Sequence, residues 1–393
     1  MQDSFRATAL PISAATLLSM LGIGMLVPAL PQLSATAGPS PLAAGGLIGA
    51  YGLARLLCNA LSGVLIDRFG IARSAYAGLL LLAADSVYGF QAISFLQLFV
   101  AMAIQGAASS LFSTAAMTAL LIKAGPQSRG RAMAWFQTSL LLGFAVGPVI
   151  GGQVVDRIGP HAPFLIQAGI ALLAVVSVRA MPASTAGGSR PGSQIIRLGT
   201  ILSSTLVIGG LGGFAAFFCR FGVAWQLVPV LALQRFQLSN AELGAIIGTG
   251  TIANVAVTPF LGRLVDGWGA MRSFVSASLL NVAGLLALYF APYHAMLWVA
   301  TAIVLFATGV MIPSAAALAL RKIPPPAMGR ATGLFRTIGE GGMALGPVVV
   351  PAMTSALGLS VFGGLLTCAV VTGAALGAAL ASSNRKPVGA PAS

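Results

Sequence analysis

The sequence predicts an all-α membrane protein with 12 transmembrane helices, which form two six-helix bundles related as parallel repeats. Three observations support this prediction: the composition is strongly apolar, twelve apolar segments have membrane-spanning length, and the two halves share a repeat with a constant offset. The first observation sets the class of protein, the second gives its helices, and the third relates its halves.

The composition excludes a soluble or disordered chain. Of 393 residues, 57% are hydrophobic and 7% are charged, and the mean hydropathy is +0.95, whereas soluble domains carry about 25% charged residues. Disordered chains are poor in apolar residues, so disorder is excluded too. The net charge of +14 alone would suggest nucleic-acid binding. However, so apolar a chain has too few polar residues to form the surface of a soluble protein. We therefore expect a multi-pass protein in the lipid bilayer, with no nucleic-acid partner.

Twelve apolar segments are long enough to cross a membrane, for which a helix needs about 20 residues. Charged residues and Pro or Gly breaks separate these segments, and the short loops between them leave no room for a soluble domain. The predicted spans cover residues 8–31, 42–66, 74–91, 95–122, 132–155, 163–181, 200–231, 241–265, 273–291, 295–320, 331–356 and 358–381.

One loop has the composition of a linker. Residues 182–198 are rich in Gly, Ser and Pro, and they leave six predicted spans on either side. The predicted domains are therefore an N-terminal six-helix bundle at 1–181, a cytoplasmic linker at 182–199, and a C-terminal six-helix bundle with a short cytoplasmic tail at 200–393.

The basic residues orient the chain. If both termini lie inside, 16 of the 21 Lys and Arg fall in cytoplasmic segments, two fall in outer loops, and three fall within spans. Such an excess of cations in short cytoplasmic loops is the usual orientation signal of membrane proteins. We expect both termini in the cytoplasm, in a membrane of the bacterial inner (plasma) type.

Two pairs of segments repeat at one constant offset along the chain. Residues 63–74 match 262–273 at six of twelve positions, and residues 130–148 match 329–347 at nine of nineteen. The two halves are therefore copies in the same orientation. Parallel repeats of this kind place a substrate site between the halves near the middle of the membrane, and they alternate access by rocking.

A motif between spans 2 and 3 resembles the signature of the major facilitator superfamily. The pattern is Gly-x-x-x-Asp-Arg-x-Gly followed by basic residues, and it is matched by Gly63, Asp67, Arg68, Gly70 and Arg73. The number of spans, the central linker and the repeat agree with this resemblance along the whole chain. The resemblance implies the major facilitator fold and transport of a small molecule by alternating access.

Two further motifs resemble the twelve-span drug:proton antiporter group, which implies an exporter. Residues 21–31 fit the span 1 pattern Leu-Gly-x5-Pro-x-x-Pro. Two departures weigh against proton coupling and cationic cargo, because Met102 replaces the family's span 4 Arg and span 1 has no acid. In span 5, small residues that favour close helix packing and one helix-bending proline fit the antiporter motif: Gly143, Gly147, Pro148, Gly151 and Gly152.

The superfamily signature suggests a conformational latch. Asp67 ends span 2 on the side where span 11 begins at Arg330, so it can face the positive end of that helix dipole. By the repeat, Asp266 would face the start of span 5 and Arg131. We expect these residues, with the rest of the signature, to hold the cytoplasmic side closed in the outward-open state. Ordinary orienting charge in the loops is the alternative interpretation.

Five charged residues lie well inside the predicted spans, away from the span ends, where each costs about 2.5–3.5 kcal/mol on insertion scales and is usually paired or functional. Arg336 and Glu340 are four residues apart and share one face of span 11. They form either a self-neutralising structural pair, or a site in which Glu340 binds the proton and Arg336 favours its ionised form. The five residues are Arg55, Asp85, Arg220, Arg336 and Glu340.

The other intramembrane residues extend this candidate site. Arg55 lies in span 2 with Asn59 one turn later, and the superfamily fold would bring span 2 beside span 11, where Arg55 can meet Glu340. Arg220 lies in span 7 among aromatic residues that include Trp225, which either stack a planar substrate or face lipid and neighbouring helices. We expect Asp85 to be peripheral, with a partner or a lipid-facing water defect.

These observations favour a secondary transporter. Three Arg against two acids inside the membrane favour anionic or zwitterionic cargo. The chain has no Gly-x4-Gly-Lys-Ser/Thr loop for ATP and no metal-ligand or Ser-His-Asp cluster, so we expect no enzyme, metal or cofactor. We expect a monomer that exports an organic small molecule, coupled to protons. The alternatives are an importer or exchanger of organic anions and, from another class, a sensor or scaffold that lost transport.

Overall fold

The computed structural model of the chain describes residues 2–35, 41–124, 129–181, 204–321, 323, 328–356 and 361–383. Within these residues the regular structure is entirely helical, as the sequence predicts. The linker predicted at 182–199 lies outside the described residues, so the domain boundaries stay predictions.

The first half contains the helices that match the first six predicted spans. The first predicted span is broken near its end, where Pro28 lacks the N–H that a continuing helix needs. The elements are α1 (Gln2–Leu26), the short α2 (Leu30–Ser34), α3 (Pro41–Phe69), α4 (Ile71–Phe90), α5 (Phe95–Ala124), α6 (Arg129–Arg157), α7 (Ala162–Ser177) and the 3₁₀ turn η3 (Val178–Ala180).

The second half matches the last six predicted spans. Its first span is one continuous helical segment made of α9 (Ser204–Gly222), the π-helical turn η4 (Val223–Leu227), α10 (Val228–Val230) and a second π-helical turn, η5 (Leu231–Arg235). Short π-helical turns are rare and often occur at functional sites. The remaining helices are α11 (Asn240–Trp268), α12 (Ala270–Tyr289), α13 (His294–Leu320), α14 (Met328–Ala356) and α15 (Val361–Ser383).

Among the described residues, the twelve predicted spans thus correspond in order to twelve helical segments. Eight of these are long and apolar enough to cross a membrane by length and composition alone. The other four are α4, α7, α11 and α14. Two of these, α11 and α14, lie at the contact between the halves.

The helix boundaries follow the sequence repeat. Helices α3 and α11 begin at Pro41 and Asn240, which are equivalent positions of the repeat, and the starts of α4 and α12, α5 and α13, α6 and α14, and α7 and α15 are equivalent in the same way. The breaks before α4 and α12 occur at Gly70 and Gly269, whose φ angles are +90° and +85°. Glycine adopts this conformation at no steric cost, which explains why both copies of the motif keep it.

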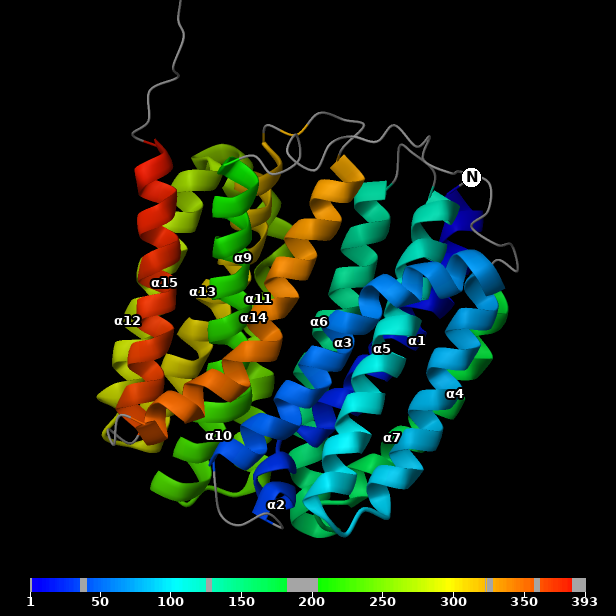
Figure 1. Cartoon of the computed structure of the whole chain (residues 1–393), viewed down its shortest axis with the longest axis horizontal. Helices are drawn as coiled ribbons and strands as arrows, with labels where there is room; N and C mark the ends of the chain where they lie inside the picture. Colours follow the sequence, from blue (N-terminus) through cyan, green and yellow to red (C-terminus); the bar gives the residue numbers. More distant parts are fainter. Residues whose placement is uncertain are drawn as a thin grey trace, which may run out of the picture.

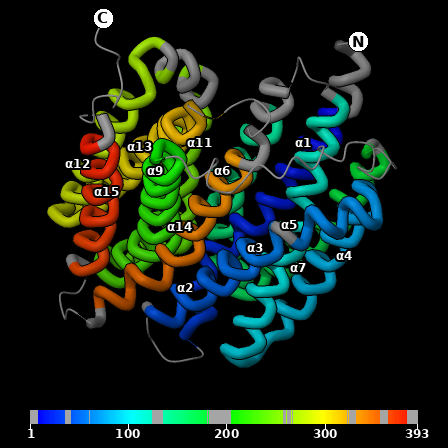
Figure 2. Tube along the Cα trace, turned by 45° about the horizontal axis from the view of Figure 1, so that its top comes forward, coloured from blue at the N-terminus to red at the C-terminus, as the bar shows by residue number. Residues whose placement is uncertain are grey.

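Helices α1–α7 form one bundle and α9–α15 the other, and the two lie side by side (Figures 1 and 2). The main contacts between the bundles run along two helix pairs, α3 with α14 and α6 with α11. Helix α1 begins, and α15 ends, at the top of Figure 1, which we call the terminal face. Helices α3 and α11 begin, and α6 and α14 end, at the other side, which we call the opposite face.

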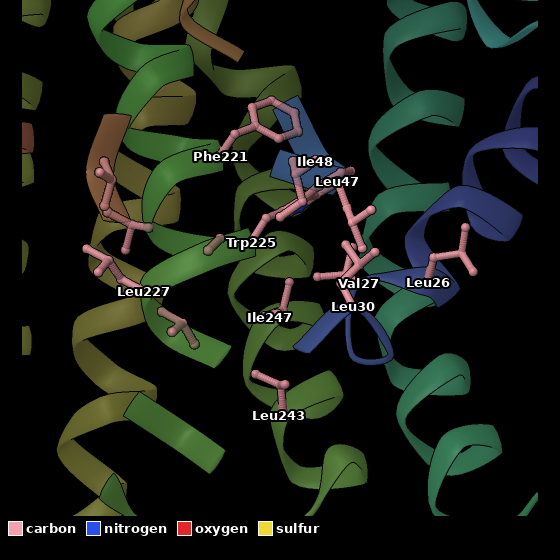
Figure 3. Close-up of a cluster of buried hydrophobic side chains, with 14 of the residues drawn as sticks. Leu26, Val27, Leu30, Leu47, Ile48, Phe221, Trp225, Leu227, Leu243 and Ile247 are labelled. Atoms are coloured by element: carbon pink, nitrogen blue, oxygen red, sulfur yellow. The ribbon is translucent and has the colours of Figure 1, made fainter. Parts of the chain in front are cut away.

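The hydrophobic core is shared between the bundles only toward the opposite face. One cluster combines Leu30 and Leu47 of the first half with Trp225 and Ile247 of the second (Figure 3). Two further clusters lie nearer the terminal face, and each is confined to one half: residues 9–181 contribute one and residues 206–379 the other. The bundles are therefore packed together near the opposite face and have separate cores near the terminal face.

Two glycines of the repeat permit this close packing. Gly45 of α3 lies against the carbonyl oxygen of Pro347 in α14, and Gly244 of α11 lies against that of Pro148 in α6. Gly45 and Gly244 are equivalent positions of the repeat, as are Pro148 and Pro347, so the contacts are reciprocal. A Cβ at either glycine would collide with backbone, which explains the preserved Gly in both copies.

Candidate functional site

A polar cluster joins the two halves near the middle of the helices. The Asn59 amide nitrogen donates to Glu340 Oε2 across the interface. Ser110 Oγ donates to Asn59 Oδ1 at 2.6 Å, which orients the amide. Glu340 is 7% exposed. We call Arg55, Asn59, Ser110, Arg336 and Glu340 the Glu340 cluster.

Arg336 forms the ion pair that the sequence spacing suggests. Its Nη2 lies 3.5 Å from Glu340 Oε1, and both residues are on α14. Its Nη1 lies 3.0 Å from the sulfur of Met117 on α5, which is a second contact between the halves. The Arg336 side chain is 36% exposed and the Glu340 side chain is 9% exposed, so the pair is open on the side of the arginine.

Arg55 does not bond directly to Glu340. Its Nη1 donates to Ser109 at 2.7 Å and its Nη2 donates to Ser113 at 3.3 Å, both on α5. It is 5% exposed and lies within electrostatic range of Glu340. Asn59 therefore makes the contact with Glu340 for which Arg55 was a candidate, and Arg55 supplies charge from a fixed position.

The balance of charge in the cluster depends on one proton. With Glu340 ionised, two arginines face one carboxylate and the cluster carries one net positive charge. With Glu340 protonated, the cluster carries two, and Arg336 loses its ionic partner. Neutral hydroxyl groups from Ser109 and Ser113 accept from Arg55 but do not offset its charge.

Arg220 lies outside this cluster. It is 8% exposed, and its Nη1 donates to the Leu305 carbonyl at 3.1 Å and lies 3.5 Å from Thr308 Oγ1, both on α13. Among the described residues it has no carboxylate partner. Thr308 and Ser109 occupy equivalent positions of the repeat, so each half holds one buried arginine against a hydroxyl at the same place.

Aromatic side chains from both halves close the site toward the opposite face. Trp225, in the first π-helical turn, lies with its ring centroid 6.5 Å from that of Tyr51, 5.6 Å from Phe144 and 4.8 Å from Phe221. Tyr51 is one turn nearer the opposite face than Arg55. Trp225 and Phe221 are buried, so they do not face lipid, and in this conformation they pack between the halves (Figure 3).

The span 5 motif has a packing role in the structure. Gly143, Gly147 and Gly151 lie one turn apart along α6, and each faces the backbone of α1. Gly152 instead faces the Asn240 carbonyl of α11, and the carbonyl oxygen of Pro148 lies against Gly244 of α11. The motif therefore lets α6 approach both α1 and α11 closely.

The signature residues lie at the terminal face. Asp67, Arg68 and Arg73 are exposed and form no ion pair among the described residues, and space around Gly63 is open. The side chains of Arg131, Asp266 and Arg330 lie outside the part of the chain that the structure describes. The latch therefore stays a prediction.

Asp85 has neither the lipid-facing position nor, among the described residues, the partner that the sequence suggests. It is 3% exposed and lies on α4, which packs against α5 and α7 within the first half. Neither carboxylate oxygen has a hydrogen-bond partner among the described residues. It is thus remote from the second half but enclosed by protein, because neighbouring helices cover the face of α4 that carries it.

Three serines on the hydroxyl side of the site were not predicted from the sequence. Ser109, Ser110 and Ser113 of α5 receive or orient the polar groups of α3. Their spacing places all three within slightly more than one helical turn of a largely apolar span. This concentration of hydroxyl groups is the sequence feature that could have identified them.

Sequence comparisons match most of the chain to one family of proteins. Residues 12–347 match the sequence profile described as the Major Facilitator Superfamily. An uncharacterized MFS-type transporter of Methanocaldococcus jannaschii is 24% identical over 359 residues, which cover 88% of this chain and 90% of that protein. Multidrug resistance protein 2 of Bacillus subtilis is 26% identical over 267 residues, or 65% of this chain and 66% of that protein.

Solved structures share the fold. The human organic anion transporter MFSD10 superposes with a TM-score of 0.67 at 21% identity and covers 96% of this chain and 99% of its own. The nucleoside transporter NupG superposes with a TM-score of 0.76 at 14% identity, over 96% of this chain and 100% of its own. At these identities the likeness establishes the fold and leaves the cargo open.

Proposed function

The chain belongs to the Major Facilitator Superfamily, and on this premise we propose that it is a proton-coupled secondary transporter of a zwitterionic or anionic organic molecule. That it is an integral, multi-pass membrane protein that transports a small molecule follows from the family. The cargo, the coupling and the direction are proposals.

The contact between Asn59 and Glu340 carries the proposal. It joins the two halves through a carboxylate that also pairs with Arg336. Protonation of Glu340 removes a charged acceptor, so it weakens the tie between the halves and releases Arg336 at the same time. One proton thus acts on both the conformation and the charge of the site, which is what coupling requires.

Efflux by exchange with protons is the first candidate direction. The span 5 motif resembles that of exporters, and one relative is named a multidrug resistance protein. In this mechanism the cationic group of a zwitterion takes the place of the proton on Glu340, while its anionic group binds an arginine. Cargo and proton then compete, and an inward proton gradient drives export.

Import of an organic anion together with a proton is the second candidate. It is favoured by the arginines, because a purely anionic cargo and Glu340 compete for Arg336 and the anion binds best when Glu340 is protonated. The predicted orientation places the terminal face in the cytoplasm. With that orientation the structure is closed to the outside. Both import and export include a state of this kind in their cycle.

Flux measurements separate these candidates. The purified protein is placed in proteoliposomes, and labelled amino acids and labelled aromatic monocarboxylates are offered with a pH gradient of either sign. Exchange drives cargo against the proton flow and co-transport drives it along the flow, and Glu340→Gln removes the response to the gradient in both cases. The control is Glu242→Gln, an exposed acid at the start of α11. Absence of flux for every compound, with Glu340→Gln identical to wild type, contradicts the proposal and favours the sensor or scaffold.

A further inference from the structure

An aspartate at the end of α6 joins the two halves at the opposite face. Asp156 Oδ1 accepts from the Asn240 backbone N–H at 3.2 Å and from the Asn240 side-chain amide at 2.7 Å. Its Oδ2 accepts from the backbone N–H of Ala241 at 2.8 Å. Asp156 belongs to the first half, and Asn240 and Ala241 begin α11 of the second. We call this set of hydrogen bonds the Asp156 clasp.

The clasp uses the N-terminus of a helix that already has a cap of its own. Ser239 Oγ accepts from the Glu242 backbone N–H, and the Glu242 carboxylate accepts from the Ser239 N–H, which is a complete capping box. The first N–H groups of a helix have no partner within it. Asp156 accepts hydrogen bonds from the two backbone N–H groups that the capping box leaves without a partner. Since α11 is capped locally, Asp156 is not needed to start the helix, and its contribution is to hold α6 against α11.

The surroundings of the clasp are built for close contact. One turn before Asp156, Gly152 lies against the carbonyl oxygen of Asn240. The shared hydrophobic core lies beneath, and Leu243 and Ile247 of α11 belong to it (Figure 3). The positive end of the α11 dipole favours a carboxylate at this point. The clasp is therefore the outermost contact, at the opposite face, of an interface whose deeper part is the shared hydrophobic core.

The same pair of helices carries an acid at each end. Asp156 lies one residue before the end of α6 at the opposite face, where α11 begins, and Asp266 lies near the end of α11 at the terminal face, where α6 begins. The other pair, α3 and α14, has no second clasp of this kind, because Ser355 stands at the position equivalent to Asp156 and Pro41, which lacks an N–H, stands at that of Asn240. Among the described residues, the carboxylate of the clasp thus comes from the α6–α11 pair and has no repeat equivalent in the α3–α14 pair.

We propose that Asp156 is the positioning residue that holds the opposite face closed, in alternation with the predicted Asp266 latch at the other end of the same helix pair. The proposal rests on the proposed alternating-access function, because a tie between the halves must open in each cycle. A neutral or shortened side chain at position 156 shifts the protein toward the state that is open at the opposite face.

Thiol accessibility tests this without any cargo. Cys58, Cys219 and Cys368 are first replaced by Ala, and two reporters are introduced separately. Ala50→Cys lies buried in the shared core, and Met117→Cys lies at the contact with Arg336 on the terminal side. In Asp156→Ala, labelling of the Ala50→Cys reporter by a maleimide should rise by about tenfold, which corresponds to about 1.4 kcal/mol. Labelling of the Met117→Cys reporter should fall.

Controls separate gating from damage. Glu242→Gln removes an acid from the same helix end, one whose hydrogen bonds among the described residues stay within its own half. It should leave both reporters at the parental rate. Asp156→Glu should restore part of the parental pattern. Damage to the fold raises both reporters together, whereas a shifted equilibrium moves them in opposite directions.

Unchanged labelling of both reporters in Asp156→Ala, or a rise in both, overturns the proposal. Because neither reporter needs cargo, this result is independent of the flux assay. A chain that moves no solute but shows opposite reporter shifts loses the proposed function and keeps the clasp as a conformational element.

Discussion

Asn59 of α3 donates a hydrogen bond to Glu340 of α14, so the buried carboxylate of one half is held by an amide of the other. The residues are 281 positions apart in the chain. This contact places the Glu340 carboxylate where the two bundles meet.

Glu340→Gln should uncouple transport from the pH gradient. The amide keeps an acceptor for Asn59 but has no charge for Arg336 and binds no proton. Gradient-driven flux should fall by on the order of tenfold or more, while exchange of labelled for unlabelled cargo without a gradient persists. The measurement is the ratio of these two rates in proteoliposomes. A variant that still responds to the gradient like wild type removes Glu340 from the coupling mechanism.

Arg220→Gln should weaken binding of anionic cargo. The guanidinium is buried and has no carboxylate partner among the described residues, and a hydrogen bond to a charged group contributes about 1.5–3 kcal/mol. The KM for an anionic compound that wild type transports should rise by about ten- to a hundredfold, with the response to the pH gradient retained. Arg235→Gln, at the end of η5 and away from the site, is the control. An unchanged KM for Arg220→Gln assigns this arginine to packing against α13.

Gly244→Val should disturb closure of the opposite face. Its side chain would collide with the Pro148 carbonyl on α6, and overpacking costs about 1–3 kcal/mol. We expect a lower melting temperature and faster labelling of the Ala50→Cys reporter. Gly169→Val introduces the same side chain where an added Cβ meets no atom of a neighbouring element within 4 Å, and it should leave both quantities unchanged. Equal behaviour of the two variants would mean that α6 and α11 are not held in this packing.

Asp85→Asn should leave the protein as stable as before or more stable. The wild-type carboxyl group is buried without a hydrogen-bond partner among the described residues, and burying an unpaired charge is costly. In contrast, Gln167→Leu in the same half leaves the bonded amide of Gln105 without its partner and should cost about 1–3 kcal/mol. Thermal unfolding in detergent compares the two. A marked loss of stability in Asp85→Asn would reveal a partner for this carboxylate.

Local properties of the chain were readable from the sequence. Apolar segments between charges and prolines predicted the twelve helices, and the constant offset between matching segments predicted the repeat that the helix boundaries follow. The spacing of Arg336 and Glu340 predicted their ion pair, because residues four apart on a helix share a face. Each of these depends on hydropathy or on the geometry of one helix.

Contacts between helices depended on how the bundles dock. Only the tertiary structure decided that Asn59 rather than Arg55 contacts Glu340, that Arg220 turns toward α13, and that Asp156 caps a helix of the other half. A sequence gives the face of a helix on which a residue lies. The partner of that face is set by the rotation and depth at which two bundles pack, and these depend on many side chains at once.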